Sequence, residues 1–197
     1  MDTGIKVFDD HIGGMTKEKV NVIGAKVGFG KTSLMAMVAN NTHEEGNGVL
    51  LITHDLPKIV CKMITNMTPM EVFSKRDNEL TIKSVDYDYT MDRLIEYING
   101  KENIDLVILD SVILKGSETL DVTRLNEKVK PIVMVTSQIN TPIKCEVEHK
   151  YLTEDNSNVF VINQFGDYVD GVKQGEVMFN GKTVSNITID YNNFNVN

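Results

Sequence analysis

The sequence predicts an α/β protein in which helices flank a mostly parallel central sheet. Continuous apolar runs recur at 49–53, 106–109 and 132–136, and such runs are typical of parallel strands that are buried on both faces. Segments with helical spacing alternate with these runs, which favours the α/β class. A glycine-rich turn also joins an early apolar run, 20–23, to a segment rich in helix formers. With 197 residues, the chain is expected to form a single domain over 1–197.

Local patterns predict the elements in chain order. Apolar residues at helical spacing support the helices, Pro57 fits the first turn of one of them, and Gly100 ends another. We expect a short lead-in helix and turn within 1–19, helices over 31–41, 58–67, 91–99 and 117–129, and strands over 20–24, 49–53, 80–84, 106–111, 132–136 and 159–162. A polar loop follows over 140–157, and Asn180-Gly181 predicts a C-terminal β-hairpin between strands at 176–179 and 187–190.

Charge and composition restrict the function classes. The net charge is −8, and the chain has only three arginines, Arg76, Arg93 and Arg124. A surface coated for nucleic acid is disfavoured, because that binding depends on Lys and Arg neutralising phosphates; one local loop can still bind. The chain has no N-terminal signal pattern and no apolar run of membrane-spanning length, so we expect no membrane association and a cytoplasmic location. Cys61 and Cys145 lack metal-ligand spacing and are interpreted as free thiols.

Residues 25–32 form the pattern A-x-x-x-x-G-K-T, a phosphate-binding loop with Ala in its first glycine position. Gly28 and Gly30 allow the backbone to approach a phosphate, and the N–H groups and helix N-terminus then favour the anion. Lys31 is expected to contact the β- and γ-phosphates, and the Thr32 hydroxyl to bind Mg²⁺. The strand–turn–helix context disfavours the alternative of a simple glycine-rich turn. The predicted cofactors are ATP and Mg²⁺, with nucleotide contacts from Ala25, Gly28, Phe29, Gly30, Lys31, Thr32 and Ser33.

Three polar residues stand at or just after the ends of apolar strands. In an open parallel sheet, such residues gather beside the phosphate loop. Asp110 closes its strand and is predicted to hold Mg²⁺ with Thr32. Asp55 is the candidate general base, and Gln138 the candidate γ-phosphate contact. The alternative for each is an ordinary helix cap or loop residue.

Several short segments also occur in a set order along the chain. They are Thr3-Gly4, Asp9-Asp10, Gly13-Gly14, 25–32, Thr53-His-Asp-Leu-Pro57, Asp110, Ser137-Gln-Ile-Asn140 and Asn180-Gly181. This order resembles the RecA-like ATPase domain of hexameric replicative DNA helicases of the DnaB type, over nearly the whole chain. That family has an S-L-E-M-P segment whose Glu is the catalytic base, and Asp55 stands in its place here. The resemblance implies a RecA-like P-loop NTPase fold, a hydrolase activity, and a role in DNA replication.

The chain also differs from that family's pattern. Asp55 is one methylene shorter than Glu, which places its carboxylate about 1.5 Å further back. The family has a Lys and an Arg just before the N-G turn, where this chain has Val177, Met178 and Phe179. Such an arginine finger is worth roughly three to five orders of magnitude in rate. No arginine follows Arg124. Because the sequence starts at the lead-in, we expect the family's linker helix and N-terminal domain to be missing.

Two interpretations follow. In the first, the protein is an ATP-driven motor that forms a ring or filament on single-stranded DNA. Lys115, Lys144 and Lys150 would then contact DNA phosphates, and Lys130, Lys173 or Lys182 would replace the missing finger. In the second, it is a non-catalytic accessory, loader or inhibitor that binds ATP and acts on a helicase or recombinase partner. We expect a weak or partner-dependent ATPase, encoded by a phage or a similarly compact genome.

Overall fold

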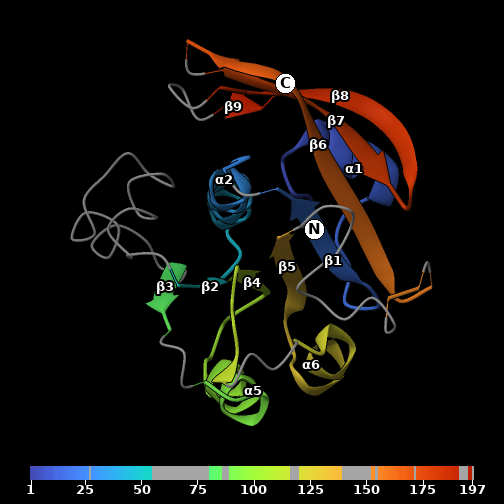
Figure 1. The fold of residues 1–197 in the computed structure, drawn as a ribbon. Helices are drawn as coiled ribbons and strands as arrows, with labels where there is room; N and C mark the ends of the chain where they lie inside the picture. The colour runs from blue at the N-terminus through green and yellow to red at the C-terminus, as the bar shows by residue number, and fades with distance from the viewer. Residues whose placement is uncertain are drawn as a thin grey trace.

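A computed structural model describes residues 1–26, 28–54, 80–85, 89–115, 120–138, 152–153, 155–170, 172–190 and 195–196. Within these ranges, nine strands form one sheet in the order β3-β2-β4-β5-β1-β6-β7-β8-β9 (Figure 1). No helix of this described part is long and apolar enough to cross a membrane.

The helices and strands have the following bounds. The helices are α1 (Lys6–Ile12), α2 (Lys31–Glu44), α5 (Met91–Asn99) and α6 (Val122–Lys128). The strands are β1 (Val20–Ala25), β2 (Val49–Thr53), β3 (Leu80–Ser84), β4 (Leu106–Asp110), β5 (Ile132–Gln138), β6 (Ser157–Val169), β7 (Val172–Phe179), β8 (Lys182–Asp190) and β9 (Asn195–Val196).

The sheet has a parallel part and an antiparallel part. Strands β3, β2, β4, β5, β1 and β6 pair in parallel with their neighbours, whereas β6, β7, β8 and β9 pair antiparallel. Strand β6 belongs to both parts, and we call the segment from β6 to β9 the C-terminal ribbon. The predicted α/β class, with a mostly parallel sheet and a C-terminal hairpin, is confirmed.

Helices cover both faces of the parallel part. Helices α1 and α2 lie on one face, and α5 and α6 lie on the other (Figure 1). Successive strand residues alternate between the two cores: Leu51 packs with the α1 and α2 side, and Leu50 packs with the α5 and α6 side. This double burial explains the continuous apolar runs in the sequence.

The lead-in anchors the N-terminus to α2. The Thr3 backbone N–H and hydroxyl both donate to Asp9 Oδ1, at 2.8 and 2.9 Å. Gly4 has a φ of 71°, and a Cβ there would lie 2.2 Å from Asn41 Nδ2. Asn41 in turn donates to the Thr3 carbonyl oxygen at 3.2 Å. Thr3, Gly4 and Asp9 therefore hold the N-terminal segment against α2 in this chain.

Most element boundaries agree with the predictions to within two residues, and five elements differ by more. Strands β7 and β8 begin at Val172 and Lys182 instead of 176 and 187. Helix α2 runs to Glu44 instead of 41, and α6 begins at Val122, where Asp121 caps it by accepting from the Arg124 N–H at 2.9 Å. Strand β6 has 13 residues, because it continues beyond β1 and pairs with β7. The predicted helix over 58–67 lies outside the described residues.

Candidate nucleotide-binding site

The phosphate loop connects β1 to α2 through two left-handed glycines. Gly28 has a φ of 74°, and Gly30, the N-cap of α2, has a φ of 76°. Residues with a Cβ seldom adopt this conformation, so the motif's glycines are required by the backbone path. Helix α2 then starts directly at Lys31, with the Leu34 N–H bonded to the Gly30 carbonyl oxygen at 2.9 Å.

The Lys31 ammonium folds back over this loop. Its Nζ donates to the carbonyl oxygens of Ala25 and Lys26, at 3.0 and 3.2 Å, and the residue is only 8% exposed. Thr32 is half-buried and Ser33 is buried beside it in the first turn of α2. A cation and a hydroxyl at a helix N-terminus fit a Mg²⁺-bound phosphate group.

Asp110 ends β4 inside the protein, and a neighbouring strand orients it. Its side chain is fully buried, and its Oδ1 accepts from the Thr136 hydroxyl at 2.8 Å. The same hydroxyl accepts from the Ser111 N–H at 2.8 Å, and Ser111 has a left-handed φ of 53°. Thr136 therefore positions the carboxylate, although the sequence did not single it out.

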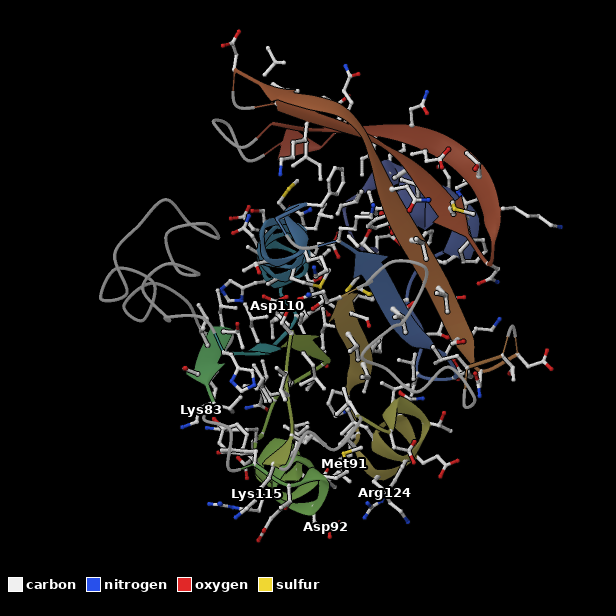
Figure 2. The ribbon with its side chains drawn as sticks, viewed as in Figure 1. Lys83, Met91, Asp92, Asp110, Lys115 and Arg124 are labelled. Atoms are coloured by element: carbon white, nitrogen blue, oxygen red, sulfur yellow. The ribbon has the colours of Figure 1, made fainter. Side chains whose placement is uncertain are left out.

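Sheet register brings these groups to one edge. Ala25, which starts the loop, pairs with Gln138 at the end of β5. Asp110 pairs with Thr53 on one side and adjoins β5 on the other, and it lies at the sheet edge below α2 (Figure 2). The described residues contain no cluster of three His, Cys, Asp or Glu side chains. The candidate donors are therefore one carboxylate, Asp110, and one hydroxyl, Thr32. They suit Mg²⁺, which is usually bound by one or two carboxylates together with substrate phosphates.

Comparison with known protein families shows which family this chain belongs to. Residues 1–140 match the model of the DnaB-like helicase C-terminal domain. The chain belongs to this family. It is therefore an ATP-binding helicase domain of the DnaB type with a RecA-like fold, and the earlier resemblance is confirmed. A search of curated proteins found no match.

The DnaB-like match contains the phosphate loop, Asp110 and Gln138, and it ends before β6. Domains of this family generally use Mg-ATP and typically form rings on single-stranded DNA. The C-terminal ribbon of this chain therefore lies outside the matched region. Its contacts are best described from the structure itself.

In this DnaB-like domain, two alternate residues of the strand that precedes the N-G turn, Val177 and Phe179, pack against the core. Val177 is fully buried, and the Phe179 ring lies 4.8 Å from the Phe160 ring and 5.9 Å from the His11 ring, centroid to centroid. Phe160 in turn contacts Phe8 of α1 at 4.5 Å. The positions that the resemblance aligns with the family's Lys and Arg thus pack toward the chain's own α1.

The Phe29 side chain packs in the hydrophobic core. It was predicted to contact nucleotide, but its ring is fully buried, in the cluster that includes Val177 and Ile187. A Cβ at Gly175 would lie only 2.7 Å from its Cζ atom. Only the Phe29 backbone is therefore placed to serve a phosphate, while the ring joins the loop to β7.

His54 joins three strand ends beside the site. Its Nε2 accepts from the Ile113 N–H at 2.8 Å, and its Nδ1 lies 2.8 Å from the Val85 carbonyl oxygen. One neutral tautomer, with the proton on Nδ1, satisfies both bonds. Sequence reasoning missed this bridge, because both partners are backbone groups of other segments.

The remaining candidates are placed as follows. Lys115 lies beside α5, away from Asp110 (Figure 2), and its N–H is bonded to the Tyr89 carbonyl oxygen at 2.8 Å. Asp55, Lys144 and Lys150 lie outside the described residues.

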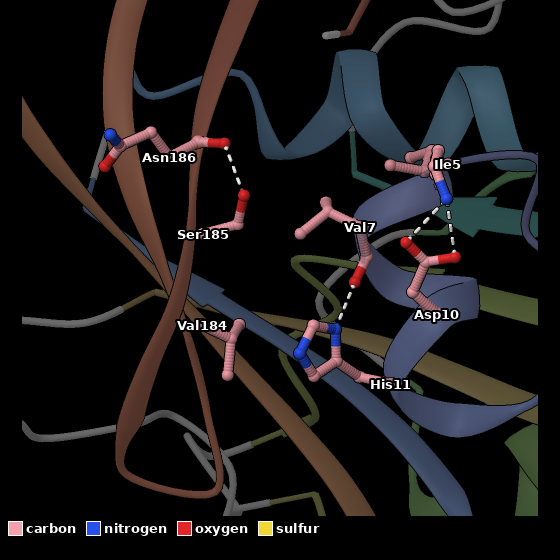
Figure 3. Close-up of a pocket in the computed structure, with 8 residues that line it drawn as sticks. Ile5, Val7, Asp10, His11, Val184, Ser185 and Asn186 are labelled. Atoms are coloured by element: carbon pink, nitrogen blue, oxygen red, sulfur yellow. Dashed lines mark hydrogen bonds and ion pairs between the residues drawn. The ribbon is translucent and has the colours of Figure 1, made fainter.

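A separate hollow lies between α1 and β8. Its volume is about 380 Å³, and its lining includes Lys6, Asp10, His11, Val184 and Asn186 (Figure 3). Lys6 and Asp10 form an exposed ion pair at 2.7 Å across one turn of α1. None of the phosphate-loop residues lines this hollow, so it is distinct from the nucleotide site.

Proposed function

We propose that this domain is a weak or partner-dependent Mg-ATPase that engages single-stranded DNA during replication or recombination. The supporting observation is the shared sheet edge that holds the Lys31 ammonium, the buried Asp110 carboxylate and Gln138. Lys31 would bind the β- and γ-phosphates, and the remaining loop residues would contribute backbone N–H groups. The proposal treats 1–197 as one domain, which the continuous sheet from β3 to β9 supports.

The chain's own residues then divide the work. Thr32 and Asp110 would hold Mg²⁺, which neutralises charge on the phosphates when bound. Thr136 keeps the Asp110 carboxylate in place through the 2.8 Å bond to its Oδ1. Gln138 would contact the γ-phosphate, and Asp55 would accept the proton of the attacking water. Lys115, Lys144 and Lys150 are the proposed DNA phosphate contacts.

Weak turnover is proposed because the usual finger positions are occupied by core residues. Val177 is fully buried, and the partly buried Phe179 packs on the Phe160 ring. Replacing either one by a charged residue would therefore remove core contacts. A ring or filament would need another cation at each interface, or a helicase or recombinase partner would supply it.

The test is ATP hydrolysis by the purified chain, with and without single-stranded DNA. We expect slow turnover that DNA or a partner stimulates, and that both Lys31→Ala and Asp55→Asn abolish. Lys128→Ala is the matched control, since Lys128 is exposed at the end of α6, on the opposite face of the sheet from α2. Absence of Mg-ATP binding in the unmodified chain would refute the proposal.

A second candidate function is a non-catalytic accessory, loader or inhibitor that acts by protein contacts. The inward-facing Phe179 and the net charge of −8 favour it. This candidate predicts that the chain binds Mg-ATP, that Lys31→Ala prevents binding, and that no turnover occurs with DNA. Turnover stimulated by DNA alone would exclude it.

A further inference from the structure

The C-terminal ribbon reaches the phosphate loop through a lysine. Lys173 Nζ, on β7, donates to the carbonyl oxygen of Gly28, 145 residues earlier in the sequence. The same nitrogen lies 5.9 Å from the centre of the Phe29 ring and 4.0 Å from where a Cβ on Gly28 would stand. A cation from a distant strand therefore touches the loop at its glycine-rich centre.

The packing of β7 fixes this reach. Lys173 and Gly175 are two residues apart on a strand, so they face the same side of it. Gly175 lies directly against the Phe29 ring, with space for no side chain, since a Cβ would also come within 2.8 Å of the Asn163 carbonyl oxygen. Val177, the next residue on that side, is fully buried in the same core. Three successive residues of one strand face thus hold the ribbon on the loop.

We propose that Lys173 supplies, from the same chain, a cation that contacts the terminal phosphate of ATP. The proposal rests on the proposed ATP site. The Gly28 carbonyl oxygen is a neutral acceptor, whereas a phosphate oxygen is charged and binds an ammonium more strongly. The lysine stem is flexible enough to exchange one for the other. Lys31 and Lys173 would then approach the phosphates from α2 and from the ribbon.

The described arginines and Lys182 lie away from the phosphate loop. Arg124 pairs with Asp92, and Arg93 lies over the Tyr89 ring; these contacts are on α5 and α6, across the sheet from α2. Lys182, on β8, pairs with Phe179 at the closed end of the hairpin. Phe179 is six residues further along β7 than Lys173, so Lys182 lies far from the loop contact. Of the three lysines considered as substitutes for the finger, Lys173 is the one in contact with the loop.

The experiment compares the affinities of Mg-ATP and Mg-ADP by calorimetry. We expect Lys173→Ala to weaken Mg-ATP binding about tenfold or more, as the loss of one charged hydrogen bond implies, and to change Mg-ADP binding less than about twofold. Lys173→Arg should restore most of the ATP affinity. Lys182→Ala, an exposed lysine of the same ribbon, should match the unmodified protein.

The nucleotide comparison separates a phosphate contact from a merely structural role. Equal losses for Mg-ATP and Mg-ADP mean that Lys173 only supports the loop, and this overturns the inference. Unchanged affinities overturn it as well, while Lys31→Ala losing both nucleotides would leave the proposed ATP site standing. An unmodified protein that binds neither nucleotide refutes the ATP site and the inference together.

Mixing two variants tests whether the cation comes from the same chain. If Lys173 acted on a neighbouring subunit, a mixture of Lys31→Ala and Lys173→Ala chains would form some complete sites and recover tight Mg-ATP binding. A same-chain contact predicts no recovery at any ratio, because neither variant carries both lysines. Recovered binding would overturn the same-chain assignment.

Discussion

The parallel part of the sheet and the C-terminal ribbon support the phosphate loop in different ways. The parallel part supplies polar groups from strand ends, with Asp110 and Gln138 brought beside the loop by register. The ribbon supplies packing and one cation, through Gly175 and Lys173. The family match covers the first contribution and stops before the second.

The strand-end polar groups lie within the part of the chain that matches the DnaB-like family, whereas the C-terminal ribbon lies outside that part. The ribbon, by contrast, turns the positions of the family's Lys and Arg onto its own α1 through Phe179 and Phe160. It also places Lys173 on the loop of the same chain. A catalytic contribution that usually crosses a subunit interface would here come from within one subunit.

Gly175→Val gives the sharpest test of the ribbon, with the largest expected effect. The new Cβ would meet Phe29 Cζ at 2.7 Å and the Asn163 carbonyl oxygen at 2.8 Å, so the ribbon must move off the loop. We expect a loss of about 3 kcal/mol in the free energy of unfolding, measured by urea denaturation, together with weaker Mg-ATP binding.

Gln174→Val is the matched control for Gly175→Val. It introduces the same side chain one residue earlier, at an exposed position on the other face of β7, and should change stability by less than about 0.5 kcal/mol. Equal effects from both variants would mean that the Phe29–Gly175 contact does not hold the ribbon.

Phe179→Arg tests whether the hairpin can serve as a finger. It restores the charge found in the family, but removes a ring that lies 4.8 Å from Phe160. We expect a loss of about 2 kcal/mol in stability and no gain in ATP turnover. Phe179→Leu, which keeps an apolar side chain, should lose less. Faster turnover in a stable Phe179→Arg protein would show that the hairpin end does reach a neighbouring subunit.

Sequence patterns could predict the parallel part because its signals are local. The strand over 80–84 and the helix over 91–99 coincide with β3 and α5. Their signals are local: the residue pattern of each segment and, for the helix, the glycine that directly follows it at Gly100. Asp110 could be found because it directly follows an apolar run. Thr136, the residue that orients Asp110, could not be found in the same way. It reaches Asp110 only through the register between β4 and β5.

The ribbon was predicted less completely for a related reason. Strand β6 was expected to cover 159–162, yet it runs from Ser157 to Val169, past polar residues such as Asn163. Pairing with Glu176 and its neighbours on β7 extends it, and no local pattern encodes that pairing. The Lys173 contact spans 145 residues, so it follows from the folded topology alone.

Thr136→Val tests the parallel part with a smaller expected effect. The change keeps the shape of the side chain but removes the hydroxyl that donates to Asp110 Oδ1 and accepts from the Ser111 N–H. We expect a loss of about 1.5 kcal/mol in stability and a larger Mg²⁺ requirement for ATP hydrolysis. Thr136→Ser keeps both bonds and should retain the Mg²⁺ dependence. Unaltered Mg²⁺ dependence in Thr136→Val would mean that Asp110 needs no such support.

His54→Phe should have the smallest effect, and it probes how the parallel part closes its own edge. The ring is kept, but the bonds to the Ile113 N–H and the Val85 carbonyl oxygen are lost. Ile113 is 39% exposed, so water can replace part of what is lost, and thermal unfolding should report about 1 kcal/mol. His54→Gln, which retains a donor and an acceptor, should lose less.

Because the ribbon makes none of these contacts, the Mg-ATP to Mg-ADP affinity ratio should not change with His54→Phe, whereas Lys173→Ala should lower it. A change in that ratio would mean that the two parts of the sheet do not act on the nucleotide separately.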